Sequence, residues 1–289
     1  MPSAYLRRRR LAAELRKIRE ERGWSVEAVA EKIFISESKI TRLENAQLRP
    51  DLGDVMNILD LFEIEGNQYD RLAKLARTAA QKGWWDRYGM AMGPRQKIAA
   101  DLESSAATIR SYHHTAMPGV LQSQEFLAAL IELDRRQGPI NYDPQRMAEA
   151  LGYRQRELLR SDGPTYETVL DEYVIRRLDV PLEIMAAQLR HMAELVSAEE
   201  RISVRVLPYD ARVEGGFLPK SPFFLYTFME PGDPPMALVE TITTDLVLTQ
   251  RREVKKYDDM YARLRKATLP PKSSLAFLNR VAKRLGEQT

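Results

Sequence analysis

Two short amphipathic segments, each preceded by a serine, constrain the fold of the N-terminal part of the chain more than any other feature. Ser25 is a suitable N-cap for a helix that carries an inward apolar stripe. Ser36 can cap another short helix over residues 37–45, in which Ile40 and Leu43 point inward. The outer face of this second helix is left polar.

Further helical patterns flank this pair on both sides. The apolar spacing over residues 7–22 predicts an amphipathic helix, and Gly23 is a suitable stop for it. Residues 51–62 and 68–82 predict two more helices after a polar loop. The chain up to residue 82 is therefore predicted to fold as an N-terminal all-α unit of five helices.

The excess positive charge of the chain lies in this N-terminal unit. The whole chain has 44 Lys+Arg against 41 Asp+Glu, and residues 1–82 hold 16 of the basic and 13 of the acidic side chains. The remaining residues are therefore neutral overall. Such asymmetry indicates a unit that faces a polyanion. The alternative is a basic first helix, dense in charge over residues 1–22, that is only solvated.

The stretch LRKIREERGWSVEAVAEKIFISESKITRLENAQLRPD resembles the helix-turn-helix of the Cro/C1 repressor type, also called the XRE family. The resemblance implies that helix 37–45 enters the major groove of DNA, while the helix before it lies over the phosphate backbone. It also implies a partly buried ion pair between Arg19 and Glu44 that joins helix 7–22 to helix 37–45. The DNA-binding residues that it implies are Ser25, Ser36, Glu37, Ser38, Lys39, Thr41, Arg42, Asn45 and Arg49.

The resemblance implies different roles for these side chains. Lys39 and Arg42 are expected to reach phosphate oxygens or a guanine edge. Glu37 is expected to act as a filter on sequence, because a carboxylate near the DNA backbone is unfavourable unless it accepts from cytosine N4. Val26 stands where family members often carry a glutamine that helps to hold the backbone.

A five-helix unit that binds another protein is the alternative to DNA binding. The outer face of residues 36–42 has no apolar side chain that could anchor a protein partner, and it has several that suit phosphates. This composition favours DNA.

Residues 83–97 break the helical periodicity with three glycines and a proline, and they predict a linker between two domains. Trp84, Trp85 and Tyr88 make this segment too aromatic for a free linker. Packing between the domains is the first interpretation of these rings, and an aromatic ligand cage is the second.

Residues 98–289 predict an α+β domain with a small antiparallel sheet. The strand candidates are YETVLDEYVI, the alternating RISVRVLP, SPFFLYTFM and PMALVETI. The expected helices cover residues 98–110, a segment through Phe126 and Leu133, and residues 143–161, 181–196, 250–267 and 271–285.

This second domain resembles the DUF5753-type domain that follows XRE motifs in actinobacterial regulators of the Scr1 antitoxin-like type. The segments that carry the resemblance are GWWDRYG, MPGVLQSQEF, RISVRVLPYDA and LVETITTDL. The resemblance implies a transcriptional regulator paired with a small partner protein of the DUF397 type. His113 stands where relatives commonly have an acidic residue.

Catalysis is not expected from this sequence. The chain has no cysteine, which excludes disulfides, thiolate catalysis and cysteine-based metal sites. His113 and His114 are adjacent, so neither a strand nor a helix places them as the i, i+4 pair of a helical metal site. No nucleophile-and-base motif or phosphate-cradling glycine loop is present, and no cofactor or metal is expected.

The leading hypothesis is a cytoplasmic, sequence-specific DNA-binding regulator that acts as a homodimer on a pseudo-palindromic operator. No uninterrupted apolar run long enough to span a membrane occurs in the sequence. The alternatives are an antitoxin-like interaction protein that binds a small partner, and a regulator that senses a small molecule. The candidate ligand or partner surface consists of Trp84, Trp85, Tyr112, His113, Phe217 and Phe224, for which ordinary packing is the competing interpretation.

Overall fold

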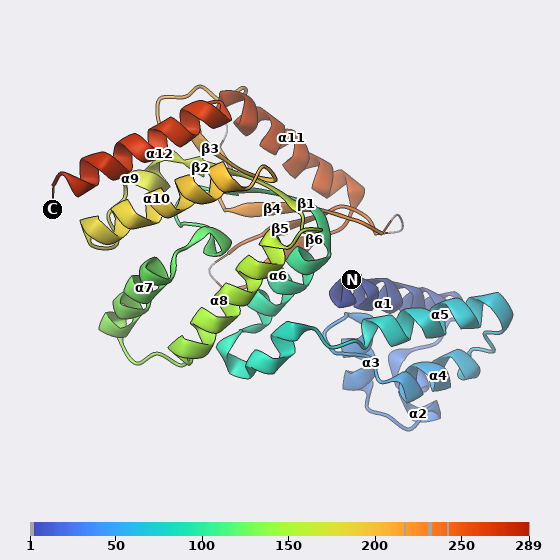
Figure 1. Ribbon diagram of the computed structural model, residues 1–289. Coiled ribbons are helices and arrows are strands. Elements are labelled where there is room, and N and C mark those ends of the chain that lie inside the picture. Colours follow the sequence, from blue (N-terminus) through green and yellow to red (C-terminus); the bar gives the residue numbers. More distant parts are fainter. Residues whose placement is uncertain (1–2, 217, 231–232, 242, 289) are drawn as a thin grey trace. The chain divides into compact units, whose positions relative to one another are not determined.

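The computed structural model describes residues 3–216, 218–230, 233–241 and 243–288. The chain divides into two compact units, Met1–Arg87 and Tyr88–Thr289 (Figure 1). The division falls inside the segment 83–97 that was expected to be a linker. Much of that segment is helical, because η1 (Trp84–Ala91) consists of two 3-10 helical pieces joined by a kink at Gly89, whose φ is 54°.

The described part of the first unit contains the five predicted helices. They are α1 (Ala4–Glu21), α2 (Val26–Lys32), α3 (Glu37–Glu44), α4 (Leu52–Leu61) and α5 (Gly66–Ala79). The predicted apolar stripes meet in one core, in which Leu15, Ile40, Leu59 and Leu72 are fully buried. The expected all-α N-terminal fold is confirmed.

The second unit is built around a six-stranded sheet with the order β3-β2-β1-β4-β5-β6. Its strands are β1 (Ala106–His113), β2 (Thr165–Asp171), β3 (Ile202–Leu207), β4 (Phe223–Phe228), β5 (Met236–Val239) and β6 (Leu246–Leu248). The α+β class is confirmed, but the sheet is mixed and larger than the small antiparallel sheet that was expected. Strands β1, β2 and β3 are parallel neighbours, and β1, β4, β5 and β6 pair antiparallel.

Helical crossovers explain the parallel half of the sheet. The chain between β1 and β2 contains η2 (Gly119–Leu121), α7 (Gln124–Gln137) and α8 (Pro144–Leu159), and the chain between β2 and β3 contains α9 (Glu172–Arg176) and α10 (Leu182–Ala198). Parallel neighbours need such long connections, whereas tight hairpins give antiparallel ones.

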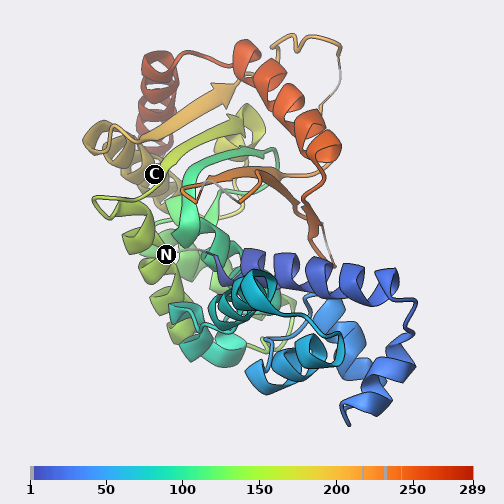
Figure 2. The same cartoon turned by 90° about the vertical axis from the view of Figure 1, so that its right-hand side faces the viewer.

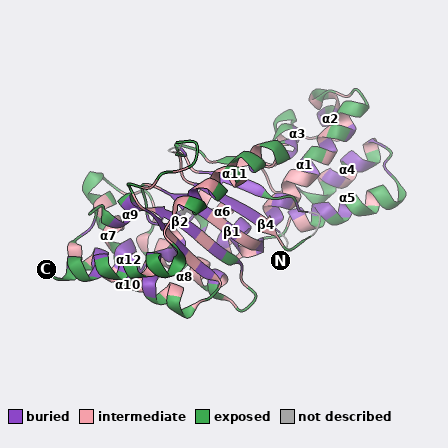
Figure 3. Cartoon of the chain, turned by 90° about the horizontal axis from the view of Figure 1, so that it is seen from above, coloured by how far each residue is buried: buried purple, intermediate pink, exposed green. Residues whose placement is uncertain are grey.

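Helices cover both faces of the sheet (Figure 1 and Figure 2). On one face, Tyr261 and Leu264 of α11 (Arg251–Ala267) pack against Tyr112, Val169 and Phe223. The other face carries α6 (Pro94–Ser105), α8 and α10, and α12 (Pro271–Gly286) packs against α10 and β3. Figure 3 shows the strands largely buried between helices whose outer surfaces are exposed.

Two sequence predictions in this unit are wrong at particular residues, and one strand was missed. The helix expected over residues 98–110 ends at Ser105, and residues 106–113 form β1 at the centre of the sheet. The strand expected over YETVLDEYVI ends at Asp171, whose carboxylate caps the short helix α9. Strand β6 was not predicted, because it is short and lies at the sheet edge.

No helix in the described parts of the chain is both long and apolar enough to cross a bilayer.

Candidate nucleic-acid interface

Two serine caps define the start of each helix in the α2–α3 pair. The Ser25 hydroxyl accepts a hydrogen bond from the backbone N–H of Ala28 at 3.2 Å, and Ser36 accepts one from Lys39 at 3.3 Å. Such caps satisfy backbone N–H groups that the helix itself leaves free. The two hydroxyls are exposed, so they remain able to take part in a second contact.

The outer face of α3 is polar and open to solvent. Ile40 and Leu43 are buried in the core of the unit, whereas Glu37, Ser38, Thr41 and Arg42 are exposed. The Ser38 hydroxyl lies 3.2 Å from that of Ser36. Among the described residues the Arg42 side chain has no ion-pair or hydrogen-bond partner, which leaves its guanidinium available to a phosphate or a base edge.

Lys39 differs from Arg42 because it is already paired within the unit. Its ammonium forms an ion pair with the carboxylate of Asp54 in the first turn of α4. The hydrogen bond to Asp54 raises the pKa of Lys39. A phosphate contact by Lys39 would therefore have to share or displace an existing anion.

The predicted DNA-binding side chains of Asn45 and Arg49 also have hydrogen-bond partners within the first unit. The Asn45 carboxamide oxygen accepts from Nη2 of Arg16 at 2.6 Å, and Arg49 donates through Nη2 to Asp86 at 2.7 Å. Asp86 also accepts from the backbone N–H of Gly83 at 3.0 Å. These contacts hold both ends of the loop after α3.

Arg19 and Glu44 connect α1 to the end of α3. Nε of Arg19 donates to one carboxylate oxygen of Glu44 at 2.7 Å, and Nη2 donates to the other at 2.8 Å. Nη1 of Arg19 donates to the carbonyl oxygen of Trp24 at 2.9 Å. The hydrogen bond to Glu44 raises the pKa of Arg19. Paired hydrogen bonds of this kind set the orientation as well as the distance of the two helices.

Tyr112 and Phe224, two of the aromatic residues proposed as one ligand or partner surface, do not share a face of the sheet. Tyr112 and Phe224 lie on paired strands but face opposite sides of the sheet, because Tyr112 packs with Phe223 while Phe224 packs on His113. Trp84 and Trp85 belong to the first unit, where their rings meet edge to face at 5.7 Å. Phe217 lies outside the described residues.

His113 is buried in the sheet without a hydrogen-bond partner for Nε2 in the described structure. Burial, with a smaller contribution from His114, lowers the pKa of His113 to about 3. The side chain is therefore neutral at physiological pH. In the described residues no group of three or more His, Asp and Glu side chains is arranged to hold a metal ion.

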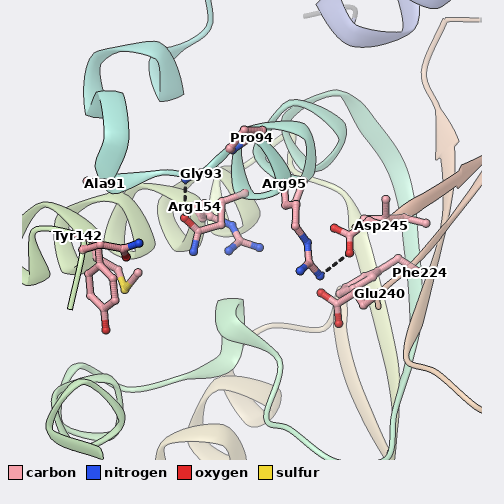
Figure 4. Close-up of a pocket in the computed structure, with 14 residues that line it drawn as sticks. Ala91, Gly93, Pro94, Arg95, Tyr142, Arg154, Phe224, Glu240 and Asp245 are labelled. Carbon is pink, nitrogen blue, oxygen red and sulfur yellow. Dashed lines mark hydrogen bonds and ion pairs between the residues drawn. The ribbon is translucent and has the colours of Figure 1, made fainter. Parts of the chain in front are cut away.

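The second unit contains a cavity of about 530 Å³ that the sequence did not reveal. Its walls come from α6, α8, β4, β5 and the loops before α8 and β6 (Figure 4). Of the aromatic residues expected to line a site, the cavity includes Phe224. The charged side chains that line it are Arg95, Arg154, Glu240 and Asp245. Their positions in the sequence are widely separated, so no local motif could have grouped them.

The two serine-capped helices and their ion-paired support define the class of the protein: it is a helix-turn-helix DNA-binding protein of the XRE-like type. The model of the helix-turn-helix domain family matches residues 10–72. The chain belongs to the DUF5753 family, because the model described as a domain of unknown function (DUF5753) matches residues 96–280. No curated protein and no solved structure matches the chain.

Proposed function

We propose that this protein is a sequence-specific transcriptional regulator that binds a pseudo-palindromic operator as a homodimer. The observation that carries the proposal is the exposed outer face of α3, where hydroxyl, carboxylate and guanidinium groups stand clear of the core. Side chains of these types read base edges and phosphates in a major groove. The proposed role is one of binding without catalysis, in the cytoplasm and on the nucleoid.

The proposal assigns distinct tasks along α3. Arg42 supplies affinity and a guanine or phosphate contact, and Ser36 and Ser38 contribute short-range polar contacts. Glu37 discriminates against sites that offer it no donor. Dimerisation would place two copies of α3 about 34–36 Å apart, or a multiple of that distance, on successive turns of the duplex.

Selection from a random DNA pool at physiological salt tests sequence specificity and symmetry together. We expect an enriched inverted repeat whose half-sites are centred about 10 base pairs, or a multiple of this, apart. Binding to the selected site should weaken steeply as salt increases, because Lys and Arg contacts release counterions. No enrichment, combined with binding that ignores salt, would contradict the proposal.

Substitution of Arg42 tests the assignment of the interface. Arg42→Ala should weaken operator binding by about 1–3 kcal/mol, which is roughly 5-fold to 150-fold. Arg77→Ala is the matched control, since Arg77 is an exposed arginine on α5, a helix that packs against α1 and α4. Equal losses from the two variants would show that charge in general, and not the face of α3, determines binding.

Binding of a small protein partner is a second candidate function of the C-terminal unit. Tyr173, Leu178 and Tyr209 expose 45%, 51% and 80% of their surface. Tyr173 and Tyr209 both lie beside Glu172, which precedes Tyr173 and accepts the backbone N–H of Tyr209 at 3.2 Å. Exposed tyrosine side chains are typical anchors of protein interfaces.

Co-expression with a DUF397-type protein tests this second function. We expect the two chains to co-purify and Tyr209→Ser to abolish that association while operator binding stays unchanged. Because Tyr209 is mostly solvent-exposed, the substitution should not disturb folding. An association that survives Tyr209→Ser and Tyr173→Ser together would exclude this surface as the partner site.

A further inference from the structure

The cavity of the second unit has the size and mixed lining of a small-molecule site. Its volume of about 530 Å³ falls within the roughly 300–1,000 Å³ of typical ligand pockets. Phe224, Leu238 and Met147 supply apolar surface from β4, β5 and α8. Charged groups converge from α6, α8 and the region after β5, so the cavity has an apolar part and a polar part.

Both arginines of the cavity already have carboxylate partners. Arg95 is ion-paired with Asp245 and also donates to the carbonyl oxygen of Thr241 at 2.9 Å. Arg154 donates to the two carboxylate oxygens of Glu103 at 2.8 and 2.6 Å. An anionic ligand would therefore compete with an internal carboxylate for either guanidinium.

Glu240 is the charged group of the cavity that lacks such a partner. Among the described residues, its carboxylate has no ion pair or hydrogen bond, although the backbone N–H of Glu240 donates to Pro222. Burial, together with the nearby negative charge of Asp245, raises the pKa of Glu240, although the positive charges of Arg95 and Arg154 partly offset this rise. A partly buried carboxylate without a donor is costly, and a cationic donor would remove that cost.

The charge balance of the whole group points in the same direction. Arg95 and Arg154 carry two positive charges, and Glu103, Asp245 and Glu240 carry three negative charges when ionised. The cavity and its immediate support are therefore one positive charge short of neutrality. In a partly dehydrated site, a ligand that brings this charge gains more than one that adds a further anion.

We infer that this cavity binds a small organic cation, an amine with an aromatic or aliphatic body, whose ammonium group pairs with Glu240. The body of the ligand lies against Phe224, Leu238 and Met147, where apolar contact favours it. This inference deepens the regulatory role that the proposed function gives to the C-terminal unit. It identifies the chemical class of an effector.

Tryptamine is the probe for the test, because it joins an ammonium group to an aromatic body. Tryptophol is its neutral analogue, and indole-3-propionate presents a carboxylate on the same ring. Binding of each to the full chain without DNA is measured by calorimetry and by ligand-observed NMR at millimolar concentrations. We expect tryptamine to bind about tenfold or more tightly than tryptophol, since a hydrogen bond to a charged group contributes that much.

Glu240→Gln should weaken tryptamine binding by about tenfold and leave tryptophol binding nearly unchanged. Glu200→Gln is the matched control, because Glu200 is an exposed carboxylate outside the cavity lining. Wild-type circular dichroism in the Glu240→Gln variant shows that the loss is local. No tryptamine binding, preference for indole-3-propionate, or equal binding by the Glu240→Gln variant would overturn the inference. None of these outcomes affects the operator selection, so failure of the ligand site and failure of DNA binding remain distinguishable.

Discussion

Arg19 of α1 holds Glu44 at the end of α3 through two hydrogen bonds, at 2.7 Å from Nε and 2.8 Å from Nη2. Only 13% of the Arg19 side chain and 6% of the Glu44 side chain are exposed. The pair therefore fixes the orientation of α3 from inside the unit, while the outer face of that helix stays free. Buried pairs of this kind cost desolvation energy, so their contribution depends on both partners being present.

Loss of one partner should lower the free energy of unfolding of the first unit more than loss of both partners. Arg19→Met is expected to lower the free energy of unfolding of the first unit by up to about 3 kcal/mol, because the buried Glu44 carboxylate then keeps only its longer contact with Nε of Arg16, at 3.6 Å. Arg19→Met combined with Glu44→Leu should recover most of that loss. Urea titration followed by tryptophan fluorescence measures both, since Trp24, Trp84 and Trp85 all lie in Met1–Arg87. A single variant within about 0.5 kcal/mol of wild type would contradict this account.

The ion pair of Lys39 with Asp54 should restrain the affinity for DNA. Asp54→Asn removes an anion next to α3 and frees Lys39, so operator binding should become several-fold tighter at low salt. The slope of log affinity against log salt should become steeper by about 0.9, the value for one additional phosphate contact. Asp60→Asn removes the same charge from an exposed position near the end of α4 and is the matched control. Identical salt slopes for the two variants would show that Lys39 does not contact phosphate.

Local patterns predicted the first unit well because its helices are specified by short-range features. Ser25 and Ser36 cap helices within three residues of themselves, and Gly23 follows the end of α1 with φ of +67°. The partners of Lys39 and Arg49 could not be found in this way. Asp54 and Asp86 come from separate segments, and only the tertiary fold brings those carboxylates to the interface.

The second unit was harder to predict because its central strand has no alternating pattern. Residues 106–113 pair with β2 on one side and β4 on the other, and both faces of the strand are covered by helices. Such a strand resembles a buried helix segment in periodicity. The charged lining of the cavity was missed for a related reason, since Arg95, Arg154 and Glu240 lie on three different elements or their ends.

Phe34, in the turn between α2 and α3, adopts a backbone conformation that favours glycine. Its φ is +56°, and its side chain is 93% exposed. Phe34→Gly should therefore raise the free energy of unfolding of the first unit by about 1 kcal/mol, because the strain of a left-handed residue exceeds the added entropy of the unfolded chain. Phe34→Ala removes the ring but keeps Cβ and should change stability little. Tryptophan-monitored urea unfolding distinguishes these outcomes, and equal stabilisation by both variants would locate the cost in the exposed ring instead.

His113 should make the second unit sensitive to acid. Burial lowers its pKa from 6.5 to about 3, so below pH 6.5 the unfolded chain binds a proton that the folded chain does not. The resulting loss of stability is about 1.4 kcal/mol per pH unit as pH falls from 6.5 toward 3, and none arises above that range. His113→Phe keeps a ring beside Phe224 and removes the titrating group. The difference in unfolding free energy between variant and wild type should therefore grow in favour of the variant by roughly 2–3 kcal/mol between pH 7 and pH 4.5.

The difference in unfolding free energy between wild type and the His113→Phe variant reports on His113 alone, because all other titrating groups are common to both proteins. Urea titrations followed by far-ultraviolet circular dichroism report both units, and tryptophan fluorescence identifies the transition of the first. Above pH 6.5 both side chains are neutral, so the offset measured at pH 7 reflects packing alone and sets the baseline. A difference that stays constant down to pH 4.5 would mean that His113 is protonated in the folded state, and that the sheet opens to water at that position.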